Sequence, residues 1–150
     1  MAKAIYQGVS GVARKVKQPF VGVSGVARKV KNAFVGVSGV ARGCYESVVY
    51  VTVTITGNGT YGGTTYAGVV YNGTTYTVAT TLTIPKGTVL QIISKANGIT
   101  TWGNIYLNGT NVNGSNTTYN YTVNSNSSIA LSVSGNAQYG IGAVVRITTS

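Results

Sequence analysis

Three arginines recur at a fixed spacing near the amino terminus, and their side chains are suited to binding anionic groups. Arg14, Arg28 and Arg42 each end a Gly-Val-Ser-Gly-Val-Ala-Arg unit, so the repeat has a period of 14 residues. A guanidinium offers five N–H donors in a planar fork that matches a carboxylate or a phosphate. The arginines therefore predict contacts with anionic groups that are themselves equally spaced.

Lysines add to this charge in the first two units. They are Lys15, Lys17, Lys29 and Lys31, and the chain as a whole has a net charge of +10. Regular basic clusters can neutralise phosphates whatever the base sequence, and they can equally face an acidic protein surface. Because each unit carries a single aromatic residue, the usual stacking platform for nucleic acid is missing. We therefore expect an acidic protein partner, with nucleic acid as the alternative.

Side chains that support catalysis or metal binding are almost absent. The chain has no His and no Asp, and Glu46 is its one carboxylate side chain. General acid–base catalysis and hard-metal sites both need such groups. Cys44 has no second cysteine for a disulfide and no His partner, and we interpret it as a small, half-buried apolar residue at a segment boundary. We expect no enzyme, no cofactor and no metal.

Short strands must position the basic residues. Each unit begins with an aromatic residue, which is Tyr6, Phe20 or Phe34. Two glycines in seven residues oppose a helix, because each costs about 1 kcal/mol relative to alanine. A Ser-Gly pair between valines predicts a tight turn, since glycine supplies the positive φ that hairpin turns need. Each unit is therefore predicted to be a β-hairpin.

The repeats hold too few apolar residues for a core of their own. A single hairpin is marginal in water, and repeat units bury their faces only against neighbours or partners. We therefore predict that residues 1–46 form a docking arm, with Tyr6, Phe20 and Phe34 as apolar anchors and the arginines paired with acidic residues. A solvated, disordered basic tail is the alternative, which the recurring aromatic and valine positions disfavour.

The remaining residues, 47–150, consist of short strands separated by turn residues. SVVYVTVTITGNG alternates and then breaks, Asn72-Gly73 lies between YAGVVY and TTYTVA, and Pro85-Lys86-Gly87 separates two further strands. Later strands are GNIYLNGTNV, NTTYNYTV, SSIALSVSG and AVVRITTS. About seven to nine short strands without a helical period are typical of an antiparallel sandwich. The sequence predicts an all-β chain in which the hairpin arm precedes an immunoglobulin-like β-sandwich.

Polar and aromatic residues of this domain have two interpretations each. Several asparagines begin Asn-x-Ser/Thr triplets that suit glycan attachment, although turn formation explains the Asn-Gly pairs among them. Trp102 would either stack on a sugar ring or pack in the core of the sandwich, and we predict that it packs in the core. The tyrosines would form an adhesive outer face or simply suit strands. They include Tyr61, Tyr66, Tyr71, Tyr76, Tyr119 and Tyr121.

Membrane and export signals are missing from the sequence. No window approaches the roughly 20 apolar residues of a membrane-spanning helix. The first residues, MAKAIYQGVSGVARKVK, lack the apolar region of a signal peptide. We expect neither a membrane partner nor export by such a signal.

The repeat block FVGVSGVARKVKNAFVGVSGVARG resembles repeats at the amino termini of virion structural proteins in tailed bacteriophages of gut-type Gram-positive hosts. WGNIYLNGTNV, TTYNYTV and IALSV are similar to the β-sandwich domain that often follows those repeats. The resemblance extends over nearly the whole chain. It departs in the third unit, where Arg42 leads to Gly43-Cys44-Tyr45 in place of Lys-Val-Lys.

This resemblance implies a virion structural protein, assembled in the cytoplasm of a bacterial host. We expect capsid decoration or a head fibre, in which the arm docks on other virion subunits and the sandwich projects outward; a tail or neck component is the alternative. A homo-oligomer would suit such a lattice. A surface carbohydrate-binding or adhesion module is the alternative of another class, in which the sandwich contacts a host-surface glycan.

Overall fold

The structure of the 150-residue chain is a computed structural model. It describes residues 6–9, 12–16, 19–23, 26–37, 40–98, 103–136 and 140–150. The chain divides into two compact units, Met1–Val49 (unit 1) and Tyr50–Ser150 (unit 2). Every regular element in the described ranges is a β-strand, so the all-β prediction is confirmed.

The described part of unit 1 contains three antiparallel strand pairs. They are β1 (Tyr6–Val9) with β2 (Val12–Lys15), β3 (Phe20–Val23) with β4 (Val26–Lys29), and β5 (Asn32–Val37) with β6 (Val40–Glu46). A valine faces a valine at the closed end of each pair, as Val9 faces Val12. The Ser-Gly pairs between these valines, and the turns predicted for them, lie outside the described residues.

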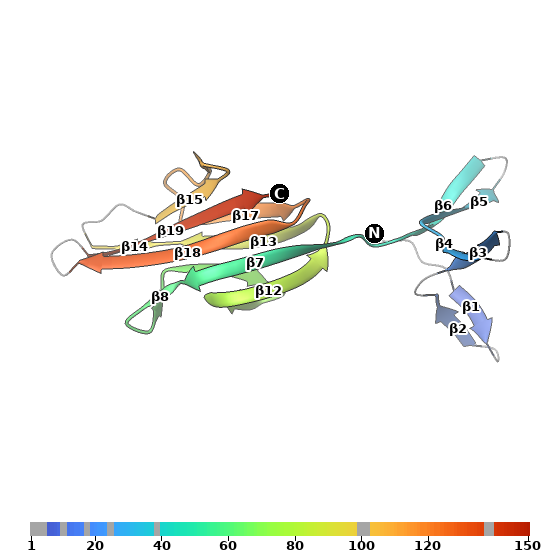
Figure 1. The fold of residues 1–150 in the computed structure, drawn as a ribbon, viewed down its shortest axis with the longest axis horizontal. Helices are drawn as coiled ribbons and strands as arrows, with labels where there is room; N and C mark the ends of the chain where they lie inside the picture. Colours follow the sequence, from blue (N-terminus) through green and yellow to red (C-terminus); the bar gives the residue numbers. More distant parts are fainter. Residues whose placement is uncertain are drawn as a thin grey trace. The chain divides into compact units, whose positions relative to one another are not determined.

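The larger sheet of unit 2 has the strand order β12-β7-β18-β19-β15-β16, with β14 paired to β19 (Figure 1). Its strands are β7 (Tyr50–Asn58), β12 (Val78–Pro85), β14 (Ala96–Asn97), β15 (Gly103–Leu107), β16 (Thr110–Asn111), β18 (Ser127–Asn136) and β19 (Gly140–Thr149). Most neighbours are antiparallel, but β7 pairs with β18 and β15 with β19 in parallel. The sheet is therefore mixed, whereas the sequence predicted antiparallel pairing throughout.

The smaller sheet has the strand order β11-β10-β13-β17. Its strands are β10 (Ala67–Tyr71), β11 (Thr74–Tyr76), β13 (Thr88–Ser94) and β17 (Thr118–Val123), and a separate short hairpin joins β8 (Thr60–Tyr61) to β9 (Thr64–Thr65). Both sheets contribute to one hydrophobic core. Its largest fully buried side chains include Ile55, Ile84, Leu90, Ile92, Ile105, Ile129 and Ile147. Two sheets around a shared core are consistent with a β-sandwich.

Strand alternation determines which residues of β7 enter the core. Val51, Val53 and Ile55 are buried, whereas the intervening residues Thr52 and Thr54 are more exposed. Successive side chains of a strand point to opposite faces of the sheet. The alternating sequence of this strand therefore places apolar side chains inward and hydroxyl side chains outward.

Two Asn-Gly turns have the backbone that the sequence chemistry requires. At Asn72-Gly73 the φ angles are 48° and 77°, and β10 pairs with β11 around this turn. A type I′ turn needs positive φ at both central residues, so the hairpin predicted here is confirmed. Asn108-Gly109 has φ angles of 48° and 86°. It divides the segment predicted as one strand into β15 and β16.

The strands on either side of Pro85-Lys86-Gly87 form, but they do not pair with each other. β12 pairs with β7 in the larger sheet, whereas β13 pairs with β10 and β17 in the smaller one. The Gly87 N–H donates to the Val123 carbonyl at 2.7 Å, which ties the turn to the end of β17. This turn therefore connects the two sheets.

Asn113 is a buried polar residue that organises the loop after β16. It is 3% exposed, and its Oδ1 accepts a hydrogen bond from the Ile105 N–H at 2.7 Å. Its Nδ2 donates to the carbonyls of Gly103, at 2.5 Å, and Asn116. The side chain satisfies three backbone groups, so its amide is engaged within the fold and does not suit glycan attachment.

We expect Asn113→Ala to lower the free energy of unfolding by about 2–4 kcal/mol, because three backbone groups would lose their partner in a buried site. Urea unfolding followed by circular dichroism measures the loss. Asn120→Ala is the matched control, since Asn120, like Asn113, begins an Asn-x-Ser/Thr triplet but is exposed. This variant should change stability by less than about 0.5 kcal/mol. Equal losses in the two variants would contradict the role assigned to Asn113.

Candidate docking site on the repeat hairpins

The aromatic residue of each repeat occupies an equivalent position in its strand pair. The opposed residues are Tyr6 with Lys15, Phe20 with Lys29, and Phe34 with Gly43. Phe20 is 56% exposed and Phe34 is 66% exposed. Large apolar side chains that remain this exposed are candidates for contact with a partner.

The arginines also occupy equivalent positions, each one residue before the position that opposes the aromatic residue. Arg14 opposes Gln7, Arg28 opposes Val21 and Arg42 opposes Val35. On the second strand of each pair, the arginine is therefore the immediate neighbour of the residue that opposes the aromatic side chain. Since adjacent strand positions belong to opposite faces of a ladder, each strand pair has one face at the aromatic position and another at the arginine position.

Three of the four predicted lysines lie at or next to the ends of the strand pairs. Lys15 ends β2 and Lys29 ends β4, while Lys31 directly precedes β5. Lys29 and Lys31 are exposed, and Lys17 lies outside the described residues. A hydrogen bond of 2.7 Å from the Ser47 N–H to the Lys31 carbonyl continues the third strand pair past its ends.

The third hairpin differs from the others through a β-bulge. Asn32 opposes Glu46 and Ala33 opposes Tyr45, but Phe34 opposes Gly43, so Cys44 is the extra residue. A bulge inserts one residue into a strand and bends it locally. The third unit, which departs from Lys-Val-Lys, thus has a strand pair that extends to Glu46. The burial predicted for the Cys44 side chain lies outside what the structure describes.

Most of the tyrosines proposed as an adhesive face belong to the core of unit 2. Tyr66 and Tyr121 are 7% and 4% exposed, and Tyr71, Tyr76 and Tyr119 pack against the buried cluster. Tyr61 is the exposed member of the predicted set, at 48%. The preference of tyrosine for strands therefore explains these residues better than an adhesive outer face does. Trp102, predicted in the core, lies outside the described residues.

The burial of two serines was not predicted from the sequence, because nothing in the neighbouring residues distinguishes them from exposed serines. Ser94 is fully buried on β13, and its hydroxyl lies 3.0 Å from the Ala143 carbonyl of β19. Ser127 on β18 lies 2.6 Å from the Tyr121 hydroxyl of β17. Both contacts connect the smaller sheet to the larger one. Hydroxyl groups buried between sheets need such partners.

Within the ranges that the structure describes, no group of three or more His, Cys, Asp or Glu side chains lies close enough to hold a metal ion. The same ranges contain no helix of the length and hydropathy needed to cross a membrane. No protein-family model, no curated protein and no solved structure matches this chain.

Proposed function

We propose that this protein is a non-enzymatic structural component of a tailed-bacteriophage particle, in which the repeat hairpins dock on other particle subunits. The observation that supports this function is the equivalence of the strand pairs: β1–β2 and β3–β4 have the same register at a 14-residue offset. Equivalent modules in one chain suit a partner that presents equivalent sites. A shell built from many identical subunits presents such sites.

The hairpins offer two modes of contact. A two-stranded sheet has edges at which a strand of a partner can add, and main-chain hydrogen bonds then supply affinity. The exposed side chains of Phe20 and Phe34 supply apolar contacts. The aromatic and arginine positions lie on opposite faces of the ladder, and the aromatic face also includes the position of Lys15 or Lys29, so the two faces contact different parts of the partner. A hairpin held between two subunits satisfies both.

Unit 2 is the part of the chain that projects outward. Capsid decoration or a head fibre is the favoured location, and the tail or neck is the alternative. Electron microscopy of particles labelled at the carboxyl terminus distinguishes these locations, because the label would decorate either the shell or the tail.

The strand order of unit 2 differs from the immunoglobulin order, in which the first strand pairs with the second. Here the first strand of unit 2, β7, pairs with β12 and β18. We therefore propose a β-sandwich of another topology.

Substitutions of the arginines and of the lysines test whether the hairpins bind protein or nucleic acid. Replacing Arg14, Arg28 and Arg42 together by lysine should reduce incorporation into particles by about tenfold or more, because the planar fork of each charge-assisted contact is lost. Replacing Lys15, Lys17, Lys29 and Lys31 by glutamine should reduce it less. Sedimentation of tagged chain with particles, across a series of salt concentrations, measures both.

Binding to phosphate would give the opposite pattern. Arginine and lysine would be roughly interchangeable, and log affinity for duplex DNA would fall linearly with log salt. If the Arg→Lys variant assembles normally while the chain binds DNA tightly and with a steep salt dependence, the partner of the hairpins is nucleic acid, and the protein-docking proposal is wrong.

A further inference from the structure

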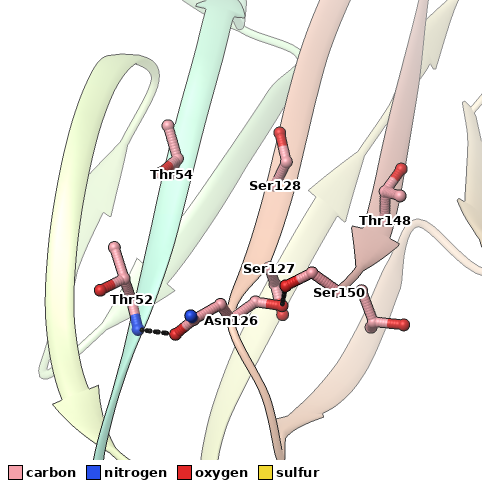
Figure 2. Close-up of a pocket in the computed structure, with 8 residues that line it drawn as sticks. Thr52, Thr54, Asn126, Ser127, Ser128, Thr148 and Ser150 are labelled. Atoms are coloured by element: carbon pink, nitrogen blue, oxygen red, sulfur yellow. Dashed lines mark hydrogen bonds between the residues drawn. The ribbon is translucent and has the colours of Figure 1, made fainter.

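The outward face of the larger sheet in unit 2 carries a row of hydroxyl side chains across four strands. Thr54 on β7 opposes Thr81 on β12 and Ser128 on β18, and Ser128 opposes Thr148 on β19. All four residues are exposed. Neighbouring strands lie about 4.8 Å apart, so the row repeats a hydroxyl at this interval. Figure 2 shows Thr54, Ser128 and Thr148 side by side on their strands.

An open groove of about 480 Å³ lies on this face, and only Thr, Ser and Asn residues line it. Asn126 fixes one end (Figure 2): its Oδ1 accepts from the Thr52 N–H at 2.9 Å, and its carbonyl accepts from the Ser150 hydroxyl at 3.1 Å. Hydroxyl groups both donate and accept hydrogen bonds. The groove is therefore suited to an uncharged ligand surface that also both donates and accepts, as the hydroxyls of a sugar do.

A cation lies next to this groove. Arg146 is exposed on β19, and its guanidinium carbon lies 5.7 Å from the centre of the Tyr106 ring on β15. The two residues oppose each other in the parallel ladder. They line a second hollow of about 370 Å³, and Thr148 lines both hollows. The hydroxyl groove and the arginine thus form one continuous surface.

Arg146 has no acidic side chain in unit 2 with which to pair. Residues 50–150 contain no Asp and no Glu, so the guanidinium has no carboxylate side chain within its own unit. Stacking on Tyr106 holds the guanidinium in place without using its N–H donors. An arginine held in this way is ready to form a bidentate pair with a carboxylate or a phosphate.

We propose that this face binds an anionic polysaccharide, with sugar hydroxyls on the Thr and Ser row and an acidic substituent on Arg146. Tyr50 adds an apolar platform beside Thr52, since it lies two residues away on the outward side of β7 and is 60% exposed. Aromatic rings of this kind pack against the C–H face of a sugar while their hydroxyl stays wet. The site belongs to unit 2 alone and does not depend on docking by the hairpins.

The test is a titration of the full ¹⁵N-labelled chain followed by amide chemical shifts, because residue-resolved shifts separate this face from the basic hairpins. Three probes are used: trigalacturonate, phosphorylated maltotriose and neutral maltotriose. We expect shifts at Thr54, Ser128, Thr148 and Arg146 with a Kd in the micromolar to millimolar range for an acidic probe. Trigalacturonate and phosphorylated maltotriose distinguish a carboxylate from a phosphate. Maltotriose should bind at least about tenfold more weakly than the better acidic probe.

Substitutions identify the contributing groups. Arg146→Gln should weaken binding of the acidic probe by about tenfold or more. Its control is Lys86→Gln, which removes an exposed cation from the turn between β12 and β13. The control should change binding by less than about twofold. Thr54→Val keeps the shape but removes one hydroxyl and should weaken binding about threefold to tenfold. Thr74→Val on β11 is its control, and it should be silent.

Three outcomes would overturn the proposal. Shifts confined to residues 1–49 would mean that the probes contact only the basic hairpins. Equal losses for Arg146→Gln and Lys86→Gln would mean that net charge alone attracts the probe. Absence of saturable shifts on this face with all three probes, up to about 10 mM, would mean that the face has no saccharide site. Particle incorporation is measured in a separate assay, so failure of this site leaves the docking proposal intact.

Discussion

Gly57→Ala should lower the free energy of unfolding of unit 2 by about 3–5 kcal/mol. Gly57 lies near the end of β7 with a φ of 81°, which L-residues with a side chain rarely adopt. A Cβ placed on it would lie 2.0 Å from the Leu131 carbonyl oxygen. Leu131 is the residue that opposes Gly57 in the parallel ladder between β18 and β7.

Two penalties therefore act at Gly57. The left-handed backbone costs about 1–2 kcal/mol with alanine, and relief of the clash requires β7 to move away from β18. Moving these strands apart disturbs pairing inside the larger sheet, because β7 lies between β12 and β18. Urea unfolding at 25 °C, followed by circular dichroism, measures the total change.

Gly87→Ala separates the two penalties. Gly87 has a similar φ of 85°, but a Cβ on it would meet nothing within 4 Å. This control should lose only the backbone term, about 1–2 kcal/mol. If Gly57→Ala costs no more than Gly87→Ala, the close approach of β7 to β18 is not the constraint that we infer.

Deleting residues 1–46 should reduce incorporation into particles to background while unit 2 stays folded. The expectation follows from the division of the chain, since β6 ends at Glu46 and the strands of unit 2 begin at Tyr50. Both main sheets, with the core residues that they share, lie within residues 50–150. The thermal midpoint of the truncated chain should therefore match that of the full chain within about 3 °C.

Removal of one repeat at a time is the matched control for this deletion. When equivalent hairpins bind equivalent sites, each further contact is intramolecular, so the overall affinity exceeds that of a single hairpin. Loss of a single 14-residue unit should then reduce incorporation partly, and loss of two units should reduce it further. Normal occupancy of the chain that lacks residues 1–46 would rule out docking by the hairpins, and an unfolded truncated chain would contradict the independence of unit 2.

Local features of the sequence were sufficient to predict the strands and some of the turns. The alternation of SVVYVTVTITGNG was sufficient to predict the strand that forms β7, because a strand has a side-chain period of two. Asn72-Gly73 was sufficient for a hairpin, because its backbone preference is a property of those two residues. The 14-residue period likewise relates Phe20 to Tyr6 at the same register position.

Only the tertiary structure decided which strands become neighbours. The turn at Pro85-Lys86-Gly87 has hairpin chemistry, yet its strands enter different sheets, since β12 finds its partner in β7 and β13 in β10 and β17. Pairing of this kind depends on contacts between residues far apart in the chain, which leave no local signal. The parallel pairing of β7 with β18 is another such contact.

The candidate sites divide in the same way. The sequence alone placed the arginines and aromatic residues of the repeats at equal intervals, because their spacing is written along one segment. It could not place Arg146 beside Tyr106, or Ser128 between Thr54 and Thr148, because these residues come from strands that are distant in the sequence. Folding of the sheet brings them onto one face, where hydrogen bonds between strands fix the register and, with it, the hydroxyl row.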